Sequence, residues 1–360
     1  MNAESRERQI IACLHPYLEA RRKEIESRLY PKHHFWGIDK IEQEDNFISS
    51  TIFPESVRIP PVIEKLLNRV LFRGSPGVKA EIASIQAARK ADLIYSVCGP
   101  LFLNHRFQRA KLVSWVFRPI EPSSSSLLNA YNEKCLRAHS GFLCLTPKAE
   151  EFYSQFAPSK FIPWCVDMDM FDGLEVNGEN EKPFFLANGK TGRDYHTFVK
   201  GCIGMDAEVR IIGPKQEKPD SLPENVNWIE TSEDPPDQAV NYPTLKKWYS
   251  QCIGVCIPLS GDADDTCGYT NMLEAMAMKK PVLMTKSGSL HIDPETDNFG
   301  KNITPKDCIG WKNAMNEILL DQGLARKFGE EGRRLAKSHF TTERFNRDVL
   351  EFLMERLACP

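Results

Sequence analysis

Short apolar runs alternate with longer helix-like segments along most of this 360-residue chain. In the first half, DLIYSVCG (92–99) and GFLCLT (141–146) are such runs. FFLANG (184–189), EVRIIGP (208–214) and GVCIPL (254–259) continue the alternation in the second half. This order of elements is typical of parallel sheets covered by helices. We therefore predict an α/β fold.

A polar, glycine-containing segment, GLEVNGENEKP (173–183), interrupts the alternation near the middle of the chain. Single hydrophobic cores stop growing at about 250–300 residues, so a chain of this length is expected to form two domains. We place the boundary next to the polar segment, with one domain over 1–170 and a second over 171–339.

Composition excludes several classes of function. The net charge is −3, so the chain carries no basic field for a nucleic-acid partner. No apolar run reaches the roughly 18 residues of a spanning helix, and the start MNAESRERQIIACLHPY does not resemble a signal peptide. Eleven cysteines without a CxxC pair indicate reduced thiols rather than disulfides or zinc ligands. These features favour a cytoplasmic protein.

The segment CGYTNMLEAMAMKKPVL (267–283) places a glycine and polar residues directly before a helical run. Helix starts expose unpaired N–H groups and partial positive charge, and so favour phosphate. We expect the backbone of Gly268, Tyr269, Thr270 and Asn271 to form such an anion site. Glu274 follows about one turn later, and its carboxylate could accept hydrogen bonds from a sugar diol. The alternative is a buried helix start whose acid pairs with another part of the protein.

This segment resembles the donor site of family 4 glycosyltransferases, in which a strand ending in proline precedes an acidic loop, an EAMA helix and a PV strand. Further segments are similar to other parts of that family, and the resemblance is carried mainly by residues 140–345. It implies the GT-B fold, with two Rossmann-like domains facing a cleft and a C-terminal helix (340–360) returning to the first domain. The matching segments are GVCIPLSGDADDTCGYTNMLEAMAMKKPVLMTKSG (254–288), FFLANGKTGRDYHTF (184–198), VRIIGP (209–214), GFLCLTPKAEEFYSQFAPSKFIPWCVDMDMF (141–171) and FGEEGRRLAKSHFTTERF (328–345).

The resemblance also implies a reaction: a hexose passes from a nucleotide diphosphate to an acceptor hydroxyl with retention at the anomeric carbon. Cations and N–H donors must stabilise the departing diphosphate. Lys190 and Arg193 match the family's basic pair, although the loop that carries them is shorter here. Glu274 matches the second acid of the family's pair, which contacts ribose. Thr266 stands where the first acid is expected, so either the adjacent Asp265 or Thr266 itself takes that role.

Other donor contacts are assigned by the same analogy. Gly189 belongs to the loop of the basic pair, and Trp228 or its neighbour Asn227 would face the base. Gly37, in PKHHFWGID, stands where the family has a glycine loop that closes on the donor. The first-domain histidine common in the family has no clear counterpart, and the residues considered in its place are Phe117, Arg118, His33, His34 and His105.

We predict no metal and no cofactor beyond the UDP-sugar co-substrate, with UDP-glucose as the first choice. Two Asp-x-Asp triplets, at 167–169 and 262–264, are the alternative that would favour a metal. The acceptor is expected to be a sugar or glycolipid in polysaccharide or glycolipid synthesis. ARRKEIESRLYPK (20–32) could make a peripheral membrane contact, but its mixed charges favour a solvated helix. A nucleotide-sugar epimerase and a non-catalytic nucleotide-sugar-binding subunit remain alternative functions.

Overall fold

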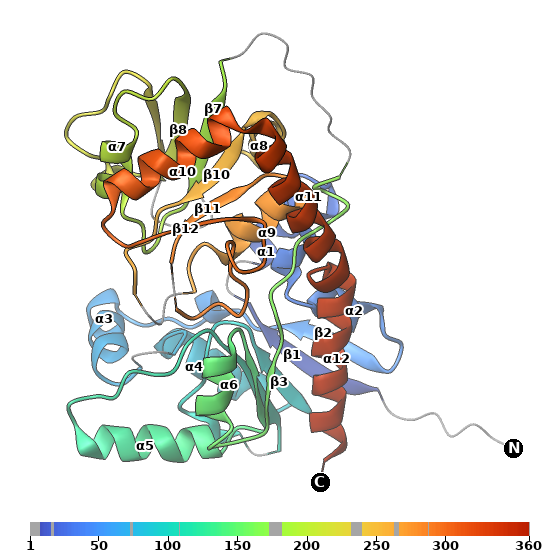
Figure 1. Ribbon diagram of the computed structural model, residues 1–360. Helices are drawn as coiled ribbons and strands as arrows, with labels where there is room; N and C mark the ends of the chain where they lie inside the picture. The colour runs from blue at the N-terminus through green and yellow to red at the C-terminus, as the bar shows by residue number, and fades with distance from the viewer. Residues whose placement is uncertain are drawn as a thin grey trace, which may run out of the picture. The chain divides into compact units, whose positions relative to one another are not determined.

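The computed structural model of the protein forms two compact units, each built on its own sheet (Figure 1). Unit 1 comprises Met1–Glu19, His34–Pro163 and Glu343–Pro360, and unit 2 comprises Ala20–His33 and Trp164–Thr342. The structure describes residues 8–15, 18–72, 75–107, 109–172, 182–231, 240–262, 266–286 and 288–359.

Unit 1 contains a parallel six-stranded sheet in the order β2-β1-β3-β4-β5-β6. Its strands are β1 (Gln9–Leu14), β2 (Phe47–Thr51), β3 (Leu93–Ser96), β4 (Lys111–Val116), β5 (Gly141–Cys144) and β6 (Ser159–Phe161). Its helices include α2 (Ile38–Gln43), α3 (Pro61–Val70), α4 (Val78–Ala87), α5 (Ser126–Arg137) and α6 (Pro147–Tyr153), while α1 (Leu18–Glu26) and α12 (Thr342–Ala358) each cross a unit boundary.

Unit 2 contains a second parallel six-stranded sheet, in the order β12-β11-β10-β7-β8-β9. Its strands are β7 (Phe184–Asn188), β8 (Glu208–Pro214), β9 (Val226–Thr231), β10 (Gly254–Ile257), β11 (Val282–Thr285) and β12 (Gly300–Ile303). Its helices include α7 (Tyr195–Gly201), α8 (Tyr242–Gln251), α9 (Tyr269–Ala277), α10 (Cys308–Leu320) and α11 (Gln322–His339).

The central strands of unit 2 are apolar on both faces. Every residue of β7, β10 and β11 is buried. Strands of this kind read as continuous apolar runs because helices cover the sheet on both sides. Four helices of unit 2 begin at side-chain caps, in which a side-chain oxygen accepts a hydrogen bond from a backbone N–H of the first turn: Asp194, Asn241, Asp307 and Asp321. The predicted α/β fold with two Rossmann-like domains is confirmed.

Some elements differ from the sequence-based expectation. The polar residues 269–271, which we expect to precede the helical run, already form the first turn of α9, which begins at Tyr269. Helix α3 was not predicted. The edge strands β6 and β12 were not predicted either, because they are short and their apolar pattern is weak. Among the described residues, no helix combines the length and the apolar character required to cross a membrane.

Candidate functional site

The strand order of unit 2 indicates where a ligand can bind. From β7 the chain continues outward through β8 and β9, whereas from β10 it continues in the opposite direction through β11 and β12. The two directions separate between β7 and β10. In open parallel sheets, ligands bind beyond the carboxyl ends of the strands at such a switch point. The relevant loops are residues 189–194, after β7, and the connection from β10 to α9.

These two loops are joined by backbone hydrogen bonds. The N–H of Asp194 donates to the carbonyl of Pro258 at 2.9 Å, and the N–H of Ser260 donates to the carbonyl of Gly192 at 2.9 Å. Arg193 and Leu259 thereby form a short antiparallel bridge. The basic loop is therefore held next to the loop that leads into α9.

Arg193 is a buried cation in this loop, with 8% of its surface exposed. Its Nη1 donates to the carbonyl of Thr191 at 2.8 Å, and its Nη2 donates to Oδ1 of Asn271 at 2.7 Å. Its buried Nε has no hydrogen-bond partner, and no ion pair joins the guanidinium to a carboxylate among the residues that the structure describes. A buried charge normally requires a counter-ion, so this site favours an anion.

Gly189 makes the position of Arg193 possible. Its φ of 146° lies in a region that residues with a side chain rarely adopt. A Cβ at this position would lie 2.3–2.5 Å from atoms of the Arg193 guanidinium. The guanidinium therefore packs directly against the backbone of residue 189, and only glycine leaves room for it.

Helix α9 begins without a side-chain cap. Gly268 is the N-cap residue, with a left-handed φ of 82°, and a Cβ there would lie 2.5 Å from Cγ2 of Ile257. Tyr269 turns its side chain into the protein, where its hydroxyl lies 3.3 Å from Nδ1 of His291. Thr270 and Asn271 are half-buried. The first turn can therefore offer its backbone N–H groups to an anion.

Glu274 lies one turn further along α9 and is 1% exposed. Its Oε2 accepts a hydrogen bond of 2.9 Å from the hydroxyl of Tyr249, which also lies 3.3 Å from Oδ1 of Asn188. Its buried Oε1 accepts no hydrogen bond within the described chain. Burial raises the pKa of Glu274 to about 7, although interactions with the hydroxyls of Tyr249 and Tyr242 oppose the shift. The carboxylate thus keeps one unused acceptor oxygen and titrates near neutral pH.

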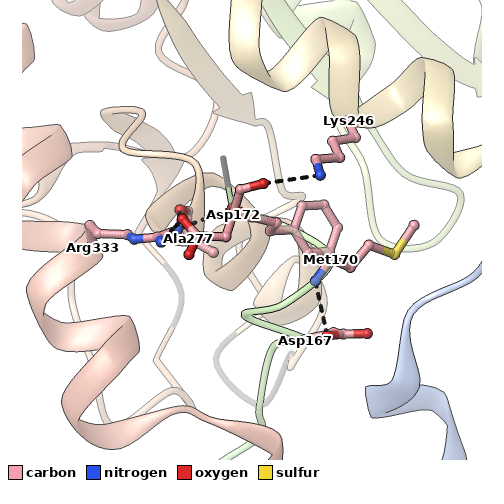
Figure 2. Close-up of polar contacts among 7 residues, drawn as sticks. Asp167, Met170, Asp172, Lys246, Ala277 and Arg333 are labelled. Atoms are coloured by element: carbon pink, nitrogen blue, oxygen red, sulfur yellow. Dashed lines mark hydrogen bonds and ion pairs between the residues drawn. The ribbon is translucent and has the colours of Figure 1, made fainter. Parts of the chain in front are cut away.

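The other end of α9 is fixed by Arg333 from α11 (Figure 2). Its Nη1 donates to the carbonyl of Phe171 at 3.1 Å and also to the carbonyl of Ala277, in the last turn of α9. Its Nη2 pairs with the carboxylate of Asp172 at 2.5 Å. A cation at a helix C-terminus complements the helix dipole. Arg333 therefore stabilises the helix whose first turn forms the candidate site.

Three further residues are predicted to contact the donor: Lys190, Trp228 and Asp265. Lys190 is half-buried in the same loop as Arg193. Trp228, in β9, packs edge-to-face on Tyr195 at 5.1 Å. Asp265 lies outside the described residues. The structure does not test the roles of these residues in donor binding, so they stay predictions.

Gly37, in unit 1, is the N-cap of α2 and has a φ of 81°. A Cβ there would lie 3.2 Å from Val349 of α12, so the close approach at this glycine is to a helix of the same unit. The preceding Trp36 packs its ring against Trp115 and Phe117 at 5.4 and 5.6 Å. Trp36 is therefore packed against aromatic side chains of unit 1, and the donor contact of Gly37 stays a prediction.

The first Asp-x-Asp triplet is engaged in local structure. The carboxylate of Asp167 accepts hydrogen bonds from the N–H groups of Lys32 at 2.9 Å and Met170 at 3.1 Å, the latter drawn in Figure 2. Asp264 of the second triplet is not among the described residues. Within the described ranges, no cluster of three or more histidine, cysteine, aspartate or glutamate side chains could hold a metal ion.

Unit 1 has a pocket of about 220 Å³ beyond the carboxyl ends of β3 and β4. Its wall includes the two segments 98–100 and 116–121 together with Tyr153. Arg118 and Glu121 contribute charged groups, and the Tyr153 hydroxyl donates to the carbonyl of Arg118 at 3.3 Å. The pocket is thus polar enough to bind a hydroxylated molecule.

Sequence reasoning missed two residues of the unit 2 site, Tyr249 and Asn188. The Tyr249 hydroxyl contacts Glu274, which is 25 positions away in the chain, and Asn188 contacts that hydroxyl rather than the acid. Tyr249 follows the apolar periodicity of LKKWYSQC, which is typical of a core aromatic. No feature of the sequence indicates that its hydroxyl bonds to an acid.

Solved structures with the same architecture identify the fold. Sucrose-phosphate synthase from Thermosynechococcus elongatus superposes with a TM-score of 0.69 at 16% identity, over 98% of this chain and 100% of that one. A glycosyltransferase from Rickettsia africae gives 0.67 at 15% identity, over 98% and 100%. This chain has the GT-B fold. The GT-B protein HepE from Anabaena, solved in complex with UDP and glucose, gives 0.64 at 14% identity, over 96% and 100%. No family model and no curated protein matches the sequence.

Proposed function

We propose that this protein is a retaining glycosyltransferase of the family 4 type, which transfers a hexose from a UDP-sugar to an acceptor hydroxyl. UDP-glucose is the first donor to test. The reaction would be independent of metal ions and would take place in the cytoplasm, in polysaccharide or glycolipid synthesis.

The observation that carries this proposal is the buried guanidinium of Arg193. It is held by neutral acceptors and lies beside the first turn of α9, which has no side-chain cap. A diphosphate would supply the missing negative charge. Arginine contacts phosphate oxygens through two parallel N–H···O hydrogen bonds, and the N–H groups at a helix N-terminus add further donors. The neighbouring Lys190 would add a second cation.

Glu274 supports the nucleotide part of the proposal. Its unused Oε1 could accept a hydrogen bond from a ribose hydroxyl one turn below the phosphates. Since the carboxylate is buried, the pentose would have to displace the side chains that cover it. Structures of HepE, which has the same fold, have been solved with UDP and with UDP-glucose. This supports a uridine nucleotide as the ligand class.

The reaction then requires little covalent chemistry from the protein. The bond between the anomeric carbon and the diphosphate oxygen breaks, and its electron pair leaves with UDP. The acceptor oxygen forms the new bond, and its proton passes to the departing diphosphate oxygen. Lys190, Arg193 and the α9 N–H groups would stabilise the charge that develops on the departing diphosphate, and electrostatic stabilisation of this kind supplies much of the rate enhancement in many enzymes. Asp265 or Thr266 would orient the donor sugar.

The acceptor would bind in unit 1. The pocket of unit 1 lies at the carboxyl edge of its sheet, where ligands of such folds bind. Arg118 and Glu121 could hydrogen-bond to sugar hydroxyls or to a charged headgroup. We therefore place the sugar or glycolipid acceptor there.

Incubation with a panel of UDP-sugars tests the function. Slow UDP release without metal, accelerated by an acceptor, together with a product of unchanged anomeric configuration by NMR, is the expected result. A changed sugar on intact UDP would indicate an epimerase. Saturable UDP-sugar binding in calorimetry without any turnover would indicate a non-catalytic binding subunit.

A further inference from the structure

Helix α3 (Pro61–Val70) is attached to unit 1 through its polar side. Oδ1 of Asn68 accepts a hydrogen bond of 2.8 Å from the N–H of Val78, at the start of α4. Glu64 forms an ion pair of 2.8 Å with Lys79. Glu64 and Asn68 are four residues apart and lie on one face of the helix. The polar face of α3 therefore points toward the protein.

The opposite side of α3 is apolar and exposed. Val62 is 81% exposed, Leu66 60% and Val70 51%, and Ile63 is also exposed. Positions 62, 66 and 70 follow the spacing of one helical stripe, with 63 at its edge. We call these four residues the α3 apolar face. Helices of globular proteins usually bury such a stripe, whereas contiguous apolar patches on the surface mark interaction sites.

Basic residues border this face. Lys65 and Arg69 are exposed, lie four positions apart and occupy the flank next to Val62. Neither of them forms an ion pair within the described part of the chain, and Arg58 is exposed just before the helix. The one acid of the helix, Glu64, is compensated by Lys79. Glu55 is the nearest exposed acid in the preceding segment.

We propose that the α3 apolar face docks on a membrane surface that contains anionic lipid. An apolar stripe flanked by lysine and arginine is the pattern of helices that lie in the interface plane, with the apolar side among the acyl chains and the cations at the headgroups. The basic flank argues for lipid phosphates rather than for a neutral protein groove. The inference stands on α3 alone and does not require the proposed transfer reaction.

The segment expected to touch a membrane from the sequence, residues 20–32, lies in a different place. Helix α1 buries the side chains of Leu18 and Ile25, and Arg21 pairs with Glu24 at 2.5 Å. This helix therefore lacks an apolar stripe like that of α3. We therefore assign the candidate membrane contact to α3 rather than to α1.

Vesicle co-sedimentation of the full chain tests the proposal. We compare the wild type with the triple variant Val62→Gln, Leu66→Gln and Val70→Gln, using vesicles of phosphatidylcholine mixed with phosphatidylglycerol and vesicles of phosphatidylcholine alone. The wild type should partition onto the mixed vesicles, and the triple variant should do so about tenfold less strongly. The double variant Lys65→Gln and Arg69→Gln should weaken binding and reduce its salt dependence.

A matched control replaces three exposed apolar residues of other helices, Leu127→Gln, Ile309→Gln and Leu320→Gln, and should bind like the wild type. Circular dichroism melting checks that all variants fold, with Leu66→Gln alone as the milder test. Failure of the wild type to bind, or equal binding of the triple variant, would overturn the proposal. Equal affinity for both vesicle types would overturn the anionic-lipid assignment. Loss of a wild-type dimer in the triple variant would instead assign the face to a second copy of the chain.

Discussion

Arg193 donates a hydrogen bond of 2.7 Å from Nη2 to Oδ1 of Asn271, and so joins the loop after β7 to the first turn of α9. The two residues are 78 positions apart in the chain. The contact directs a buried guanidinium toward a helix N-terminus, so two sources of positive potential meet at the switch point of the unit 2 sheet.

Replacing Gly189 by alanine should disturb this arrangement first. The added Cβ would collide with the Arg193 guanidinium, and the backbone φ of 146° would be strained. We expect a loss of stability of about 1–3 kcal/mol and a loss of UDP affinity. Gly204→Ala is the matched control, because it also has a positive φ but meets only Lys312 Nζ at 3.8 Å. Chemical denaturation and calorimetry measure both effects. Equal UDP affinity of the two variants would contradict the role of Gly189.

Arg193→Lys separates charge from geometry. Lysine keeps the charge but cannot donate to both Thr191 and Asn271 as the two Nη atoms of arginine do, so we expect a large fall in turnover with UDP-glucose.

Lys190→Ala should also lower turnover while changing the melting temperature little, since Lys190 is half-buried. Lys215→Ala, at an exposed lysine of unit 2, is the control. Full activity of folded Lys190→Ala and Arg193→Lys would remove both residues from the site.

Glu274→Ala should weaken UDP binding by on the order of 1–3 kcal/mol, because a charged acceptor of ribose hydroxyls is lost. Titration calorimetry at pH 8, where the carboxylate is ionised, measures the change. Tyr249→Phe serves as a second variant, since it removes the hydrogen bond to Oε2 without removing the acid. An unchanged UDP titration in Glu274→Ala would refute the ribose contact.

The same acid should make stability depend on pH. The pKa of Glu274 is raised to about 7 in the folded protein by burial, above its ordinary value of 4.5. The folded state therefore retains a proton that the unfolded chain loses, and this contribution is fully present below about pH 4.5 and lost as pH rises through 7. Compared with Glu274→Gln, the wild type should lose about 2 kcal/mol between about pH 5 and pH 8. Urea unfolding at both pH values checks this, and parallel curves for the two proteins would contradict it.

Removal of divalent cations should leave the transfer rate unchanged. Lys190, Arg193 and the α9 N–H groups would carry the stabilisation of the diphosphate, so no metal is needed. Initial rates with UDP-glucose are compared after EDTA treatment and after addition of magnesium or manganese. A strict requirement for manganese would favour the Asp-x-Asp interpretation of the acidic loop, which includes Asp262.

The sequence alone determined the architecture and placed the candidate anion site along the chain. Continuous apolar runs such as FFLAN and VLMT require burial on both faces, so they predict parallel strands between helices. Gly268 before a helical run indicates a helix start without a side-chain cap. Both signals are local, because they depend on the chain's own periodicity and backbone preferences.

Only the tertiary structure decided which side chains meet. The strand order brings residue 193 to residue 271, and Tyr249 to Glu274, across distances in sequence that no periodicity spans. The same holds for α3, where apolar spacing by itself would favour a buried stripe, but Asn68 and Glu64 attach the polar face to the protein instead. Local patterns specify helices and strands, whereas the partner of a buried charge or an apolar face depends on how the sheet orders its strands and on which helices pack against it.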